Sequence, residues 1–261
     1  MALLATKLFL APLCVIAVSL AGRRWGVAVA GVLGGLPVVA GPILLVLTLI
    51  HGRSFGAAAA AGTLLGLTAL TAFVVVYGRI APSSPPAATV VAGWTAFLGG
   101  VALLTLIHPP PLGALILVGI GFAVGIGLLA APRRPLAPSG TLPWWDLPAR
   151  GGAALVLVVA VTGASGALGP HLSGLLAPFP IVTSVLAVFT HAHSGTDQVR
   201  VLLRNFLVGF YGFAAFCFML AITLNSLGVV AAFSVALAAA LAVQTVTFAI
   251  RSRPARILAR T

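Results

Sequence analysis

Residues 11–39 (APLCVIAVSLAGRRWGVAVAGVLGGLPVV) and residues 154–182 (ALVLVVAVTGASGALGPHLSGLLAPFPIV) read as two copies of one segment. At a constant offset of 143 positions ten residue pairs are identical, among them Pro37 and Pro180. The register continues without a gap beyond these segments, with roughly 20 identities over about 100 positions, about twice what this skewed composition gives by chance. The chain is therefore predicted to contain an internal duplication.

The composition is that of a membrane protein. Apolar residues make up 61% of the chain and charged residues only 6%, and the mean hydropathy is +1.22, values outside the range of soluble domains. Stretches long enough to cross a hydrocarbon core of about 30 Å recur about nine times, so we expect an all-α, polytopic transmembrane bundle. These stretches are 5–22, 27–50, 55–77, 87–107, 112–131, 151–168, 171–192, 199–224 and 227–250.

Membrane topology explains the net charge of +12 better than nucleic-acid binding does, because the basic residues are scattered over the loops. With a cytoplasmic carboxyl terminus, nine crossings place all the lysines and arginines inside except Lys7 and Arg53. We therefore expect a multi-pass protein of the bacterial plasma (inner) membrane with its amino terminus outside. The arginines placed inside are Arg23, Arg24, Arg79, Arg133, Arg134, Arg150, Arg200, Arg204, Arg251, Arg253, Arg256 and Arg260.

The same topology orients the two copies. The first copy starts outside and the second inside, so the repeats are predicted to be inverted, and the fifth helix is the odd crossing that reverses them. The expected architecture is 4+1+4. Residues 1–110 form the first four-helix repeat, residues 111–149 the linking helix with a cytoplasmic Pro/Trp-rich linker, and residues 150–261 the second, inverted repeat.

Pro37 and Pro180 occupy equivalent places in helices two and seven, about 15 Å from the helix start and thus near mid-membrane. A proline there removes a backbone hydrogen bond and clashes with the preceding turn, so we expect both helices to be broken. Paired breaks in an inverted repeat are typical of transport sites, where the polar ends of half-helices face a cavity. A simple packing kink is the alternative interpretation.

Polar residues within the expected helices mark a candidate substrate site, mainly in the second half. Arg200 and Arg204 are one turn apart and share a helix face with Tyr211, and guanidinium groups bind phosphates or carboxylates. The alternative is that both arginines extend to the cytoplasmic headgroups. The candidate substrate-binding residues are Pro37, Gly41, Thr48, Pro180, Thr183, Ser184, His191, Arg200, Arg204, Asn205 and Tyr211.

His191, His193 and Asp197 suggest a metal site by residue type but not by spacing. Residues i and i+2 of a helix point roughly 200° apart, so the two imidazoles reach one ion only if the helix has ended near Ala192. We therefore predict no metal. An ordinary interfacial loop and a hydrogen-bonding or proton-accepting histidine are the two interpretations that remain.

The sequence has no motif for covalent or cofactor chemistry: no Gly-x-Ser-x-Gly elbow, no His-Glu-x-x-His, no phosphate-binding loop and no acidic pair. We therefore expect neither an enzyme nor a cofactor. The only acids are Asp146 and Asp197, both away from mid-membrane, which excludes a central carboxylate that exchanges protons for a cation. Cys14 and Cys217 fall within expected helices and are interpreted as small buried apolar residues.

Four-helix units joined in opposite orientation by one extra helix resemble the drug/metabolite transporter superfamily over almost the whole chain, by architecture and not by a motif. The segment from Phe179-Pro180-Ile181 through His191 to Gly195-Thr196-Asp197 is similar to small GlpM-type bacterial inner-membrane proteins, over one half of the chain. The first resemblance implies a transporter fold. It does not extend to proton-coupled export of cations, because the membrane-embedded acid of the small multidrug members is missing.

We predict a transporter or lipid flippase that moves an anionic or zwitterionic small solute or lipid headgroup by alternating access. The expected partners are the lipid bilayer and this cargo, with no nucleic acid, and a homodimer is also considered. The alternatives are a non-transporting subunit of an envelope or polysaccharide assembly complex and an intramembrane enzyme. A polar cavity that reaches Pro37 and Pro180 would favour transport, and a solid midplane would favour the subunit. A cleft with converging His191, His193 and Asp197 would favour the enzyme.

Overall fold

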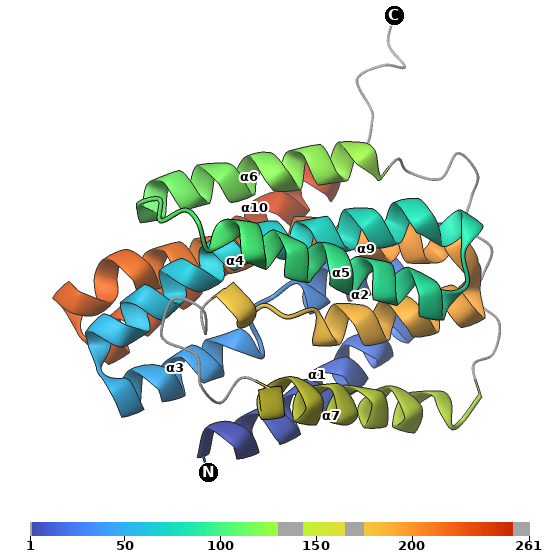
Figure 1. Ribbon diagram of the computed structural model, residues 1–261, viewed down its shortest axis with the longest axis horizontal. Helices are drawn as coiled ribbons and strands as arrows, with labels where there is room; N and C mark the ends of the chain where they lie inside the picture. Colours follow the sequence, from blue (N-terminus) through green and yellow to red (C-terminus); the bar gives the residue numbers. More distant parts are fainter. Residues whose placement is uncertain (1, 130–142, 165–174, 253–261) are drawn as a thin grey trace, which may run out of the picture.

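The computed structural model describes residues 2–129, 143–164 and 175–252, and within these ranges the chain is α-helical with short connections and no β-strand (Figure 1). The elements are α1 (Ala2–Trp25), α2 (Val27–Gly34), α3 (Ala40–His51), α4 (Arg53–Ile80), the 3-10 turn η1 (Ala81–Ser83), α5 (Pro86–Leu104), α6 (Pro111–Leu128), α7 (Asp146–Ala164), α9 (Ile181–Leu227) and α10 (Val229–Ser252).

Glycines with positive φ separate several of these helices. Gly26, Gly52 and Gly228 stand directly before α2, α4 and α10, with φ of 91°, 89° and 80°. Gly195 has a φ of 84° inside α9 and divides it into a first arm, residues 181–194, and a second arm, residues 196–227. A side chain is strained in this conformation, so glycine permits an abrupt bend where a loop would otherwise be needed.

Both expected proline breaks are confirmed. α2 ends at Gly34 and α3 begins at Ala40, with Pro37 in the irregular connection between them. Pro180 directly precedes the first arm of α9 and follows a non-helical stretch at 177–179. Proline has no N–H to donate to the preceding turn, which accounts for an interruption at both places.

α4 and α9 form the centre of the bundle. The apolar windows of α4 and α9 are 72% and 61% buried, whereas those of α5, α6 and α10 are 33% buried or less. α5 and α6 pack on α4, and α10 packs on α9. α1 and α7 lie side by side along the edge of the bundle opposite α6 (Figure 1).

Five helices in the described ranges are long and apolar enough to cross a membrane, namely α4, α5, α6, α9 and α10. The all-α fold is thus confirmed, together with five of the roughly nine membrane-length apolar helices predicted from composition. α7 begins at Asp146, before the expected start of the second repeat at residue 150. Pro148 is compatible with this earlier start because the first turn of a helix has no intrahelical N–H bonds to lose. Residues 130–142 of the expected linker lie outside the described residues.

Candidate functional site

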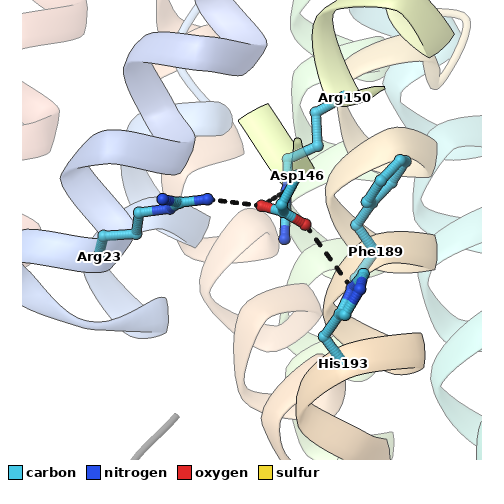
Figure 2. Close-up of polar contacts among 5 residues, drawn as sticks. All are labelled: Arg23, Asp146, Arg150, Phe189 and His193. Carbon is cyan, nitrogen blue, oxygen red and sulfur yellow. Dashed lines mark hydrogen bonds and ion pairs between the residues drawn. The ribbon is translucent and has the colours of Figure 1, made fainter. Parts of the chain in front are cut away.

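Asp146 is the centre of a buried ionic cluster (Figure 2). Its side chain is 0% exposed, and its Oδ2 atom accepts hydrogen bonds of 2.8 Å from Arg23 Nη2 and Arg150 Nε. Its Oδ1 atom lies 3.6 Å from Nδ1 of His193. We call Arg23, Asp146, Arg150, Phe189 and His193 the Asp146 cluster; it connects the end of α1, the start of α7 and the first arm of α9.

Helix ends favour the charges in this cluster. Asp146 is the first residue of α7, where the helix dipole stabilises an anion, and Arg23 is in the last turn of α1, where it stabilises a cation. Arg150 lies one turn after Asp146, and its guanidinium carbon is 5.1 Å from the centre of the Phe189 ring, a cation–π contact. Each buried charge therefore has a favourable partner.

The arginines keep Asp146 ionised despite its burial. Burial alone raises the pKa of Asp146, but the hydrogen bonds and charges of Arg150 and Arg23 outweigh it and lower the pKa from its ordinary value of 3.8. Among the described residues Oδ1 of Asp146 has no hydrogen bond, because Nδ1 of His193 is 3.0 Å from the Phe189 carbonyl oxygen instead. That oxygen only accepts, so a hydrogen bond between them requires the tautomer of His193 with a proton on Nδ1.

His191 and His193 face different neighbours. His191 is buried with its Nδ1 3.4 Å from the hydroxyl of Tyr77 on α4, whereas His193 faces Asp146. The first arm continues beyond Ala192, so the divergence expected for positions i and i+2 applies. In the part of the chain that the structure describes, no three His, Cys, Asp or Glu side chains are placed to hold a metal ion.

The candidate residues of the first half lie in and after the break between α2 and α3. Pro37 is in the break, and a β-carbon added to Gly41 would lie 3.4 Å from the ring of Phe216. Thr48 is buried near the end of α3, where its hydroxyl donates to the Leu44 carbonyl at 2.7 Å. The Thr48 donor is therefore satisfied within its own helix.

Pro180, Thr183 and Ser184 stand together at the start of the first arm. The two hydroxyl residues are buried, and Ser184 Oγ accepts a 2.9 Å hydrogen bond from Nε1 of Trp94 on α5. Trp94 was not among the candidate residues predicted from the sequence. The available signal was that an indole N–H within an apolar helix needs an acceptor.

Arg200, Arg204 and Tyr211 follow one face of the second arm, beside α6. Arg204 Nε donates to the Ile126 carbonyl and the Tyr211 hydroxyl to the Gly119 carbonyl, both at 3.4 Å. The equal spacing of donors and acceptors indicates two antiparallel helices side by side. Nε of Arg200 is buried and has no hydrogen-bond partner among the described residues.

Arginines also satisfy the carboxyl-terminal end of α6. Arg79 Nη1 donates to the Leu128 carbonyl at 3.3 Å, next to the bond from Arg204 to Ile126. The last carbonyls of a helix have no intrahelical partner and carry negative partial charge, so donors from α4 and α9 are favourable here. This gives Arg204 a structural role in addition to the binding role expected from the sequence.

A groove of about 490 Å³ lies between α6, the second arm of α9 and α10. Tyr211 is the one candidate substrate-binding residue in its lining, which is largely apolar. The lining residues are Ile126, Val208, Tyr211, Ala242, Val243, Val246 and Thr247.

The candidate residues do not line this groove together. Ser184 contacts α5, His191 contacts α4, and the Asn205 amide donates to the Val201 carbonyl of its own helix at 2.7 Å. The break at Pro37 has the second arm as its neighbour. A β-carbon added to Gly35 would lie 2.8 Å from the α-carbon of Gly209, so this break lies against the second arm, the expected helix eight.

No protein family model, no curated protein and no solved structure matches this chain. The resemblances to the drug/metabolite transporter superfamily and to GlpM-type proteins therefore stay predictions. Function has to be inferred from the helical architecture, the Asp146 cluster and the groove.

Proposed function

We propose that the chain is a membrane transporter for anionic or zwitterionic solutes or lipid headgroups, built from two inverted repeats in the bacterial inner membrane. The helix boundaries support a duplication at the offset of 143 positions. α4 begins at Arg53 and the second arm at residue 196, and α5 begins at Pro86 and α10 at Val229. α6 lies between the two series, as the odd helix of a 4+1+4 arrangement.

The bends before the central helices give further support. Gly52 has φ and ψ of 89° and 168°, and Gly195 has 84° and 179°. This region of backbone conformation is open essentially to glycine alone. The same unusual bend thus occurs at equivalent positions, before α4 in one half and before the second arm in the other.

Reciprocal contacts between the halves carry the proposal. A β-carbon added to Gly209 would lie 2.4 Å from the Val32 carbonyl oxygen, and one added to Gly66 would lie 2.5 Å from the Leu175 carbonyl oxygen. At the repeat offset Gly66 is the counterpart of Gly209, and Val32 is the counterpart of Leu175. When a contact from the first half to the second is repeated from the second half to the first, the two halves are expected to be related by a two-fold axis. Charge asymmetry between the loops favours an axis in the membrane plane.

We assign the Asp146 cluster as the closure on the cytoplasmic side. Arg23 belongs to the first repeat, and its partner Asp146 lies directly before the second on the linker, where arginines are expected to face the cytoplasm. The counterparts of Asp146 and His193 are Leu3 and Ile50, both apolar, so the ionic cluster is not duplicated. Alternating access requires contacts between the halves that break on one side at a time, and a buried ion pair is such a contact.

One observation favours the second candidate function, a non-transporting subunit of an assembly complex. α2 and the break after it are packed against the second arm, since β-carbons added to Gly31 in α2 and to Gly35 in the break would lie 2.4 Å from the Leu202 oxygen and 2.8 Å from the α-carbon of Gly209. If the chain is a transporter, this contact must open during the cycle, and the packing belongs to an occluded state. If the chain is a non-transporting subunit, the packing is permanent.

Flux in proteoliposomes separates the two functions. We expect purified protein in vesicles of phosphatidylcholine and phosphatidylglycerol to accelerate either translocation of a fluorophore-labelled phospholipid, measured by dithionite bleaching, or uptake of radiolabelled carboxylate and phosphate solutes. Asp146→Asn should change the rate, because it removes the cytoplasmic ion pairs, whereas Asp197→Asn, at an exposed acid, should not. Absence of flux for every probe by folded protein would favour the subunit.

A further inference from the structure

The groove between α6, α9 and α10 offers a hydrocarbon surface. Its two hydroxyl groups are already used: the Thr247 hydroxyl donates to the Val243 carbonyl at 2.7 Å and the Tyr211 hydroxyl donates to the Gly119 carbonyl. The rest of the lining is aliphatic. A volume of about 490 Å³ is within the range of roughly 300–1,000 Å³ found for ligand pockets. The groove is therefore suited to an apolar chain.

Positive charge stands at one end of the groove. Arg204 lies one turn before Val208 on the same helix face and donates to Ile126, which itself lines the groove. Its bond of 3.4 Å is long, and the buried Nε of Arg200, one turn further, has no partner among the described residues. The ion pairs found in the described ranges are all made by Asp146, so neither Arg200 nor Arg204 has a carboxylate there.

In the proposed topology the charged end and the apolar lining follow one another along the membrane normal. The rise from Arg204 to Tyr211 is about 10 Å, less than the roughly 15 Å of one leaflet's hydrocarbon. In the proposed topology the second arm starts on the cytoplasmic side. The guanidinium groups then lie toward the headgroups, and the apolar lining extends from there toward the midplane.

We infer that this groove binds an anionic phospholipid of the cytoplasmic leaflet. One acyl chain lies along Val208, Val243 and Val246, and the lipid phosphate pairs with Arg204 and Arg200, whose forked guanidinium groups match phosphate oxygens. A net negative headgroup is favoured because neither cation forms an ion pair with a carboxylate in the described ranges. The inference goes beyond transport, since a lipid bound here can stabilise the bundle without being cargo.

A second copy of the chain is the competing occupant of an apolar groove. The two arginines disfavour it, because a protein partner would bury both guanidinium groups and the chain has only two acids to pair with them. A phospholipid supplies the missing negative charge and leaves the headgroup hydrated.

Native mass spectrometry of the purified full chain tests the charged end. We expect dioleoylphosphatidylglycerol to bind about tenfold or more tightly than dioleoylphosphatidylcholine, the effect of a charge-assisted hydrogen bond. Arg204→Gln should remove most of this preference, and Arg204→Lys should keep part of it because the charge stays while the fork is lost. Arg53→Gln, at an exposed arginine outside the groove, is the control and should leave the preference unchanged.

A second pair of variants tests the apolar lining. Val243→Trp fills the groove and should weaken binding of both lipids, whereas Leu237→Trp, at an exposed residue of α10 outside the lining, should not. Equal affinity of the wild type for both lipids, or a preference that survives when Arg200 and Arg204 are both replaced by Gln, would overturn the site. A dimer that Val243→Trp dissociates without loss of the lipid preference would assign the groove to a second copy. If the wild type prefers the anionic lipid but shows no flux in proteoliposomes, the result counts against the transport proposal and not against the lipid site.

Discussion

Gly209 lies so close to the carbonyl oxygen of Val32 that a β-carbon added to the glycine would be 2.4 Å from that oxygen. The contact is from backbone to backbone and joins the second arm of α9 to α2, so rotation of a side chain cannot relieve an added atom. At the equivalent position in the other half, a β-carbon added to Gly66 would lie 2.5 Å from the Leu175 carbonyl oxygen. Small residues are therefore required where the halves meet.

Gly209→Ala and Gly66→Ala should each destabilise the protein by about 1–3 kcal/mol, the usual cost of overpacking a close contact. The measurement is the melting temperature in detergent. Gly99 is a matched control because it lies within α5 with no atom within 4 Å of an added β-carbon. Gly99→Ala should leave stability unchanged or raise it by about 0.5–1 kcal/mol. Unchanged melting of both test variants would contradict the close approach of the halves.

Asp146→Asn should be among the most destabilising polar substitutions. It leaves Arg150, whose side chain is 6% exposed, and Arg23, at 32%, without an anion. Removal of one partner of a buried ion pair costs about 3–5 kcal/mol, measurable by chemical or thermal denaturation. Asp197→Asn replaces an exposed acid and should stay within about 0.5 kcal/mol of the wild type. If Asp146→Asn is as stable as the wild type, the buried ion pairs of the Asp146 cluster do not form.

Acid should weaken the same cluster. The pKa of Asp146 in the folded protein is below its ordinary value of 3.8, so its contribution to stability is present above that pH and is lost as the pH falls through the folded-state pKa. Melting temperatures between about pH 6 and pH 3 should show the gap between wild type and Asp146→Asn narrowing at the acid end. A gap that is constant or widens toward acid would mean that the carboxylate is not stabilised by its arginines.

The two glycine bends give a further prediction. An added β-carbon at Gly52 or Gly195 meets no atom of the described residues within 4 Å, so we attribute any cost of alanine there to the positive φ. We expect each substitution to cost about 1–3 kcal/mol in thermal unfolding, because this backbone region is essentially closed to residues with a β-carbon. Gly127 also has open space around it but lies in helical backbone, so Gly127→Ala should be neutral or stabilising. Equal melting temperatures of all three variants would show that the bends do not require glycine.

The fold was predictable from the sequence where the chain follows local rules. Apolar length predicts the membrane-length helices, and Pro37 and Pro180 interrupt helices because proline lacks the required N–H. Cys14 and Cys217 are buried thiols, as their apolar surroundings indicate. The bend at Gly195 was not predicted, because the backbone φ of an isolated glycine in an apolar stretch cannot be inferred from the sequence.

The candidate site was less predictable because it depends on contacts between distant segments. The sequence places Asp146 in an interfacial linker, and its burial follows only once α1, α7 and α9 meet. The available signal was that a chain with two acids and 14 lysines and arginines should pair them. Likewise Arg204 meets the end of α6 and Ser184 meets Trp94, contacts that no local pattern reveals.

The accessibility of Ser83 and Ser226 from the two sides of the membrane decides whether the repeats are inverted. The two serines are counterparts at the repeat offset, both are exposed, and each hydroxyl donates at 3.1 Å to the carbonyl three residues earlier. Ser83→Cys and Ser226→Cys, each in a chain with both native cysteines replaced by alanine, are labelled in cells with a membrane-impermeant maleimide. If the repeats are inverted, position 226 reacts in intact cells and position 83 only after permeabilisation. Labelling of both positions from the same side would contradict the inverted repeats.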